Sequence, residues 1–279
     1  MKTQRPPAGR SGSPKIGLGF LGLSGILGLF LALPVIVLVG RAVVGGALSD
    51  ALGTTAVLDA LGLSLLATTA SLLLTVAFGT PLAWVLARRH FRGSTLLETI
   101  VDLPIVLPPS VAGLALLLVF GRRGLLGEPL TFFGLAIPFT TLAVILAQTF
   151  VAAPFYVRAA RAGIAGVDRE LEDVARDLGA AERHVFLRVT IPLAAPALAA
   201  GLVMSWARAL GEFGATIMFA GNVTGRTQTL PLLVYAKFEG GDLDPSIAAA
   251  AILVLAAFGV LIAVRVLRWG RALDIRSLG

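Results

Sequence analysis

Six apolar stretches, each long enough to cross a lipid bilayer, constrain this chain more than any other feature of its sequence. A transmembrane helix needs about 20 consecutive apolar residues. The six stretches are residues 17–40, 58–87, 98–120, 137–160, 193–219 and 246–267. In a bilayer each stretch must satisfy its own backbone hydrogen bonds, which it does as a helix. The sequence therefore predicts an all-α, polytopic membrane protein with six transmembrane helices.

The composition agrees with this class. Hydrophobic residues make up 57% of the 279 residues and charged residues 14%, against about 25% charged in soluble domains. The chain has no cysteine, which excludes a disulfide framework and a thiolate metal site. Stretch 17–40 follows a basic N-terminus, but it is too long for a cleavable signal peptide and no A-x-A site follows, so we expect a retained helix. Stretch 98–120 is the least regular, because acidic residues and prolines interrupt it: Glu98, Asp102, Pro104, Pro108 and Pro109.

The distribution of basic residues predicts the orientation. Lysine and arginine are enriched in cytoplasmic loops. With the N-terminus in the cytoplasm, seventeen of them fall in cytoplasmic segments and five in outer segments. We therefore expect both termini and the loop 161–191 to lie in the cytoplasm. The net charge of +7 is then a consequence of topology rather than a sign of nucleic-acid binding.

A charged, helically patterned loop separates the fourth and fifth stretches. Asp168 suits a helix N-cap, and Gly179 suits the left-handed position after a helix. Between them, apolar residues recur at helical spacing and form one stripe: Leu171, Val174, Ala175 and Leu178. A second short helix is expected over 182–189, and Pro192 suits the first turn of the next span. An amphipathic helix of this kind indicates a surface that binds a partner protein.

A helix lying on lipid headgroups is the alternative for this loop. Such helices tend to be basic on their polar face. Residues 169–177 hold two arginines and four acidic residues: Arg169, Arg176, Glu170, Glu172, Asp173 and Asp177. Anionic lipid would not favour this pattern, so the partner-binding interpretation is preferred.

Two charges fall inside the fifth stretch. Arg208 and Glu212 are four residues apart and share a helix face. They either line a polar pathway or gate, or form a pair that fixes helix packing. Nearby glycines would permit close helix approach: Gly201, Gly211 and Gly214. Asp102 is interpreted as a packing or capping residue. The turn-rich segment 220–245 is expected to be an ordered re-entrant or interfacial piece.

The sequence gives little support to an enzymatic function. A P-loop needs Gly-Lys-Ser/Thr after a glycine-rich run, and none of the lysines stands in that frame: Lys2, Lys15 and Lys237. Ser24 lies in a G-x-S-G segment, but a serine protease needs a histidine base nearby. The two histidines, His90 and His184, fall in predicted loops, which also argues against a metal site. No internal repeat is visible, which argues against an inverted-repeat secondary transporter.

The charged loop resembles the EAA loop of ABC-importer permeases. In that family the pattern is E-A-A, three residues, Gly, nine residues, then I-x-L-P. The E-A-A positions, counted back from Gly179, are Asp173, Val174 and Ala175. The I-x-L-P positions fall on 189–192 and end at Pro192. The spacing therefore matches throughout. Asp173 and Val174 depart from the pattern, although Asp173 keeps the negative charge.

Three further segments resemble the molybdate permease branch of this family. They are LPIVLPPSVAG (103–113), WARALGEFGATIMFAGN (206–222) and GRTQTLPLLVY (225–235). Sulfate permeases have similar segments, but the FGAT and TQTLP forms favour molybdate and tungstate. The resemblance implies an ABC type I importer permease fold and a location in a bacterial plasma (inner) membrane. It also implies four segments. Residues 1–15 form a disordered basic N-terminus, and residues 16–50 form a first transmembrane helix with an outer loop. Residues 51–270 form a permease core that holds the EAA loop (161–192), and residues 271–279 form a cytoplasmic tail.

The resemblance also implies partners and site residues. A homodimer of permeases would bind two cytoplasmic ABC ATPases, which hold ATP and Mg, and an external oxyanion-binding protein; this chain would be no enzyme and hold no cofactor or metal. The implied ATPase-coupling residues are Asp168, Leu171, Glu172, Asp173, Val174, Ala175, Leu178, Gly179 and Pro192. The implied pathway or gate residues are Pro108, Pro109, Ser110, Arg208, Glu212, Gly214 and Thr216. The alternatives are a sulfate or thiosulfate permease and a stand-alone secondary anion transporter or channel, which would need no docking helix.

Overall fold

The computed structural model describes residues 18–89 and 91–276, and every regular element in those ranges is a helix. The helices are α1 (Leu18–Val44), α2 (Ala47–Leu52), α3 (Thr55–Arg88), α4 (Ser94–Val106), α5 (Pro109–Phe120), α6 (Gly127–Phe132), α7 (Thr141–Ala165), α8 (Arg169–Asp177), α9 (Glu182–Val185), a π-helical segment (Phe186–Thr190), α10 (Ile191–Leu210), α11 (Gly214–Ala220), α12 (Leu230–Glu239) and α13 (Leu243–Arg276). The predicted all-α class is confirmed. The expected disordered segment 1–15, His90 and the last three residues of the expected tail lie outside the described ranges.

Five helical runs are long and apolar enough to cross a membrane: α1, α3, α7, the run from α9 through α10, and α13. The sixth candidate is a pair, because α4 and α5 meet at a bend of 119°. Stretch 98–120 is thus two helices rather than one, and the pair counts as the sixth span when it crosses the membrane as a broken helix. Leu107 and Pro108 each precede a proline, which disfavours the helical region, and both are extended, with ψ near 132° and 135°. The prolines therefore turn the chain rather than merely weaken a span.

The expected fifth span, 193–219, is also corrected at both ends. Its helix begins earlier, because α9 continues through the π segment into α10 without a break. It ends at Leu210, and Gly211 follows its last turn. After a three-residue break, residues 214–220 form the separate short helix α11.

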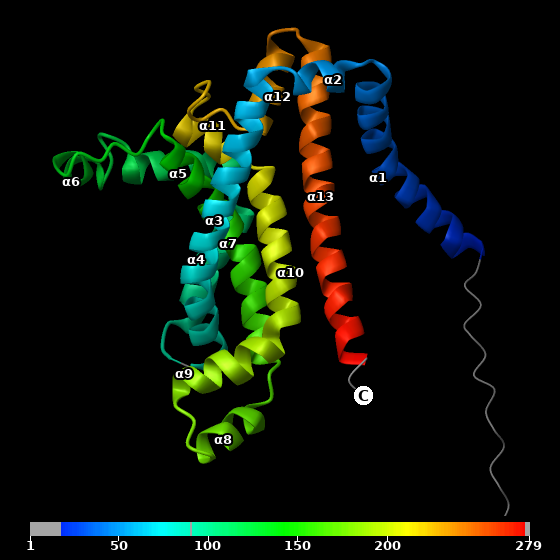
Figure 1. Cartoon of the computed structure of the whole chain (residues 1–279). Helices are drawn as coiled ribbons and strands as arrows, with labels where there is room; N and C mark the ends of the chain where they lie inside the picture. The colour runs from blue at the N-terminus through cyan, green and yellow to red at the C-terminus, as the bar shows by residue number, and fades with distance from the viewer. Residues whose placement is uncertain (1–17, 90, 277–279) are drawn as a thin grey trace, which may run out of the picture.

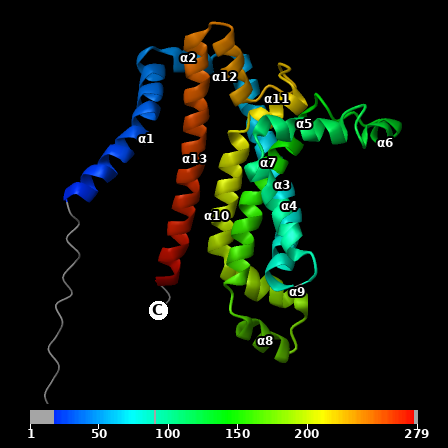
Figure 2. The same ribbon diagram turned by 180° about the vertical axis from the view of Figure 1, so that it is seen from behind.

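The core of the molecule is a bundle of α3, α7 and α10, which lie side by side in both views (Figures 1 and 2). Small residues let these helices approach closely. A Cβ added at Gly163 would lie 2.4 Å from the Cβ of Ala197, and one added at Gly201 would lie 2.8 Å from the Cβ of Ala159. Hydroxyl residues follow one buried face of α3: Ser64, Thr68, Ser71 and Thr75.

The bundle has two distinct ends. The short helices α8 and α9 lie at one end, whereas α2, α11 and α12 lie at the other (Figure 1). The segment 220–245 is ordered, as its turn-rich pattern predicted: α12 forms within it, and the amide N–H of Leu230 donates to Ser64 Oγ at 2.8 Å. Helix α6 projects sideways from the bundle near this second end (Figures 1 and 2).

Candidate functional site

Helix α8 begins and ends at the predicted residues. The carboxylate of Asp168 accepts a hydrogen bond from the N–H of Glu170 at 3.0 Å, which caps the first turn. At the other end Gly179 has φ +87°; its N–H donates to the carbonyl of Arg176, and the N–H of Ala180 donates to that of Ala175. This pair of bonds is a Schellman motif, which requires the left-handed residue that glycine supplies. The cap assignments for α8 are confirmed.

The apolar stripe of α8 faces away from the protein. Leu171 is 50% exposed, Val174 is 56% exposed and Leu178 is 84% exposed. Ala175, the fourth member, is half-buried. Three exposed aliphatic side chains on a short, charged helix form a patch that nothing in the described chain covers, which is a mark of an interaction surface. Behind Leu178, a groove of about 590 Å³ runs to His184 and Arg188.

An exposed ionic network stiffens the turn after α8. Arg176 pairs with Asp173 (Nη1 to Oδ1, 2.5 Å) and with Glu182 at the start of α9 (Nε to Oε1, 2.7 Å). The hydrogen bond to Glu182 is the main reason that the pKa of Arg176 is raised above its ordinary value, and Asp173 adds to it. Asp173 therefore lies on the rim of the stripe, where it is exposed.

Glu172 differs from the other predicted coupling residues, because it points into the protein and is 3% exposed. Its Oε1 lies 2.8 Å from Nη2 of Arg88, at the end of α3, and accepts a hydrogen bond from Thr190 Oγ at 2.7 Å. Glu172 is thus a contact between α8 and the bundle rather than part of the exposed stripe. Arg88 was missed as a functional candidate: in the sequence it looks like any basic residue at the end of a span.

The π segment lies just before Pro192 and accounts for the unbroken helix there. Pro192 has no N–H, and its ring crowds the carbonyl four residues earlier, that of Arg188. The wider π turn relieves this conflict, since the N–H of Ile191 bonds to the carbonyl of Phe186, five residues back. Pro192 is in the first turn of α10, as predicted, but it continues a helix instead of starting one.

At the other end of α10, Arg208 and Glu212 form the expected i, i+4 pair. Nη1 of Arg208 lies 2.6 Å from Oε2 of Glu212, which is 1% exposed. The second carboxylate oxygen accepts the N–H of Ala215 at 2.7 Å, in the first turn of α11. Glu212 therefore closes the break between α10 and α11, a geometry that fits the packing alternative.

The remaining predicted pathway residues gather where α5 meets α11. A Cβ added at Gly214 would lie 2.6 Å from the Cβ of Pro109, and one at Gly113 would lie 2.6 Å from the carbonyl of Ala215. Pro108, Pro109 and Ser110 are exposed at the α4–α5 bend, whereas Thr216 is fully buried. The structure thus brings Pro109 and Gly214 into contact.

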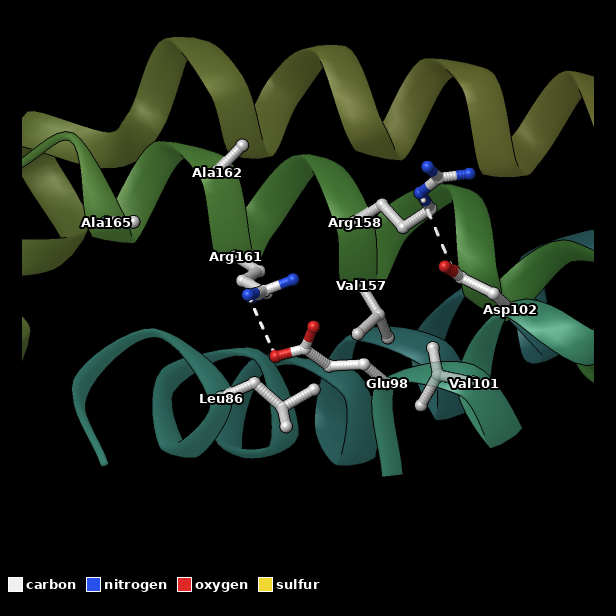
Figure 3. A pocket seen from close by; sticks show the side chains of 9 residues that line it. All are labelled: Leu86, Glu98, Val101, Asp102, Val157, Arg158, Arg161, Ala162 and Ala165. Atoms are coloured by element: carbon white, nitrogen blue, oxygen red, sulfur yellow. Dashed lines mark ion pairs between the residues drawn. The ribbon is translucent and has the colours of Figure 1, made fainter. Parts of the chain in front are cut away.

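A second charged cluster lies between α4 and α7, around a cavity of about 350 Å³ (Figure 3). Arg161 pairs with Glu98 at 2.8 Å, and Arg158 approaches Asp102 at 3.5 Å. Asp102 therefore forms an ion pair across to α7, which fits the packing role in its interpretation as a packing or capping residue. Side-chain exposures of 29% to 62% show that the rest of the described chain leaves all four groups partly uncovered.

Comparison with known proteins decides the family. Residues 79–272 match the family of binding-protein-dependent transport system inner membrane components. This chain belongs to that family. The matched range includes α8, the π segment and both buried glutamates, and membership together with the long apolar helices makes the chain a multi-pass membrane protein.

Individual relatives of the chain are also transport system permease proteins. The permease is 42% identical over 183 residues to the molybdenum transport system permease protein ModB of Haemophilus influenzae, covering 65% of this chain and 80% of that protein. It is 36% identical over 251 residues to the molybdate/tungstate transport system permease protein WtpB of Pyrococcus abyssi, covering 90% and 93%. A bacterial ABC transporter that imports alginate has a similar structure, with a TM-score of 0.71 over 90% of this chain and 94% of that one. At 18% identity, that likeness shows the ABC importer permease fold alone.

Proposed function

We propose that this permease is the membrane subunit of an ATP-driven importer for molybdate or tungstate. The relatives named for these ions support the substrate class, because they are 36% to 42% identical over most of their length. The observation that carries the mechanism is the exposed stripe of Leu171, Val174 and Leu178 on a capped helix at one end of the bundle. A helix of this kind suits a groove on another protein, where its apolar side chains would be buried.

The partner in this proposal is a cytoplasmic ABC ATPase, which binds ATP and Mg. The positive-inside distribution of lysines and arginines supports a cytoplasmic position for α8. Two copies of the permease would each present one α8 to one of two ATPase subunits. An external binding protein would deliver the oxyanion at the opposite end, where α2, α11 and α12 lie (Figure 1).

Molybdate is a dianion, and its import needs the energy of ATP hydrolysis. Entry into a cell that is 100 mV negative inside requires about 2.3 kcal/mol per charge, or about 4.6 kcal/mol for molybdate. A passive pore would therefore exclude the ion rather than accumulate it. Alternating access, driven by ATP hydrolysis at the partner and transmitted through α8, provides the required input.

The decisive experiment is reconstitution. The permease is co-purified with the ATPase and placed in liposomes, and ATP hydrolysis is measured with and without the oxyanion-loaded binding protein. We expect stimulated hydrolysis and uptake of labelled molybdate, which tungstate blocks at a similar concentration and sulfate only in large excess. Equal competition by sulfate would assign the permease to sulfate transport. Uptake by the permease without any ATPase would instead indicate a stand-alone carrier.

A further inference from the structure

Arg88 occupies the junction between a membrane helix and α8. It is the last residue of α3, and its side chain is only 9% exposed. Its Nη2 donates to two acceptors: the carboxylate of Glu172 at 2.8 Å and the backbone carbonyl of Val167 at 3.1 Å. Val167 precedes the N-cap of α8, and Glu172 lies within the helix. One guanidinium therefore holds both α8 and the segment that leads into it.

The carboxylate of Glu172 extends this connection to a third element. The oxygen that receives Arg88 also accepts Thr190 Oγ at 2.7 Å, and Thr190 ends the π segment that leads into α10. Thr190 is 1% exposed. A charged hydrogen bond shielded from water is stronger than one at the surface. Hence α8 cannot move far without displacing α3 and the start of α10 or breaking a buried ion pair.

The pair has unused hydrogen-bonding capacity. The Nε of Arg88 is buried and has no partner in the described part of the chain. The other carboxylate oxygen of Glu172 lies 3.8 Å from Arg176 Nη2, which is too far for a hydrogen bond. Arg88 and Glu172 are thus joined through one nitrogen and one oxygen, although an arginine and a carboxylate can form two parallel hydrogen bonds.

We propose that Arg88 is a positioning residue for transport, which carries the displacement of α8 into α3 and α10 through the buried carboxylate of Glu172. The proposal rests on the proposed function, because it is the ATPase that displaces α8. Arg88 itself touches neither the ATPase nor the transported ion. Its role differs from that of the exposed stripe, which binds the partner.

The first test compares Arg88→Ala with wild type in the reconstituted complex. We expect Arg88→Ala to retain the ATPase in a pull-down and to hydrolyse ATP, while uptake per ATP hydrolysed falls about tenfold, within the usual range of coupling between sites. Arg88→Lys keeps the charge but not the two-pronged donor, and we expect a smaller loss. Arg158→Gln, in the exposed α4–α7 cluster, is the matched control and should keep the wild-type ratio. A wild-type ratio in Arg88→Ala would overturn the proposal, and so would loss of ATPase binding, which would assign Arg88 a purely structural role.

The second test measures movement directly and needs no knowledge of the substrate. The chain has no cysteine, so Asp177→Cys on α8 and Phe78→Cys on α3 would be the only spin-labelling sites in the permease; both positions are exposed. In the wild-type background we expect the same distance between labels in nucleotide-free and ATP-bound complexes, because α8 and α3 move together. With Arg88→Ala we expect the distance to change with nucleotide. An unchanged distance in Arg88→Ala would refute the relay, whereas failure of the wild-type complex to import molybdate would refute only the proposed function.

Discussion

Two glutamates are buried near opposite ends of the bundle, and they differ in the origin of their arginine partner. Glu172 pairs with Arg88, which lies 84 residues earlier on another helix. Glu212 pairs with Arg208, one turn earlier on its own helix. The second bond of Glu172 also comes from a distant element, whereas that of Glu212 comes from the next helix turn. A buried carboxylate thus connects separate elements in one place and closes a local break in the other.

The difference has an energetic consequence. A charge removed from water must be paired, and removing one partner leaves the other exposed to an apolar environment. At Glu212 the loss is confined to the junction of α10 and α11. At Glu172 it releases α8 from α3 and from the π segment at once. We therefore expect stability defects at Glu212 and coupling defects at Glu172.

The largest effect is expected for a substitution in the exposed stripe of α8. It tests whether the stripe binds the ATPase independently of the buried contact that Glu172 makes. Leu171→Asp places a charge in the stripe and should reduce ATPase co-purification at least about tenfold, since buried apolar anchors dominate binding at interfaces. The permease should still insert in the membrane at normal abundance. Asp177→Asn, on the same helix but outside the stripe, is the control. ATPase recovery at the wild-type level with Leu171→Asp would show that the stripe is not the docking surface.

The next largest effect is expected for the ion pair of Arg208 and Glu212. Glu212→Gln leaves Arg208 without its counter-charge, at about 2.5–3.5 kcal/mol for a lone arginine in a span, so membrane abundance should fall. The double variant Arg208→Gln with Glu212→Gln should recover part of that abundance. Abundance is read by immunoblot and uptake in the same cells. A double variant that is abundant yet transports nothing would instead give Arg208 a role in the anion pathway.

A smaller effect is expected at the contact between α5 and α11, which the Glu212 cap supports. Gly214→Ala would place a methyl group 2.6 Å from the Cβ of Pro109 and should lower stability by about 1–3 kcal/mol through overpacking. Gly211→Ala is the matched control, because its Cβ would meet the carbonyl of Ala207 at an ordinary 3.7 Å. Thermal unfolding of the two variants in detergent separates them. Equal midpoints would mean that α5 shifts freely against α11.

The smallest effect is expected in the partly exposed charged cluster of Figure 3. Arg158 and Asp102 have side chains 62% and 41% exposed and lie 3.5 Å apart. Exposed pairs contribute about 0.2–1 kcal/mol. Asp102→Asn should therefore leave the unfolding midpoint and the uptake rate close to wild type. A large loss in either would mean that a second copy of the chain or another partner buries this cluster.

The sequence predicted the structure best where chemistry is local. Asp168 and Gly179 mark the ends of α8 because a side-chain cap and a left-handed glycine act within one turn. The prolines of stretch 98–120 signalled irregularity, but the 119° bend depends on packing that no local pattern specifies. The Arg208–Glu212 pair was visible at its i, i+4 spacing. The inward direction of Glu172 was not, since α8 carries four acidic residues and the partner Arg88 lies 84 residues away.

The π segment Phe186–Thr190 gives a different meaning to the fixed spacing between Gly179 and Pro192. A π turn holds about one residue more than an α turn, so deleting one residue from it would restore regular α-helix and leave α8 in nearly the same direction relative to α10. A second deletion would rotate everything before it, α8 included, by about 100° relative to α10. Leu178 would then no longer face outward. The π turn therefore lets the spacing between the glycine and the proline lose one residue, and no more, without changing the direction in which α8 presents its exposed side chains.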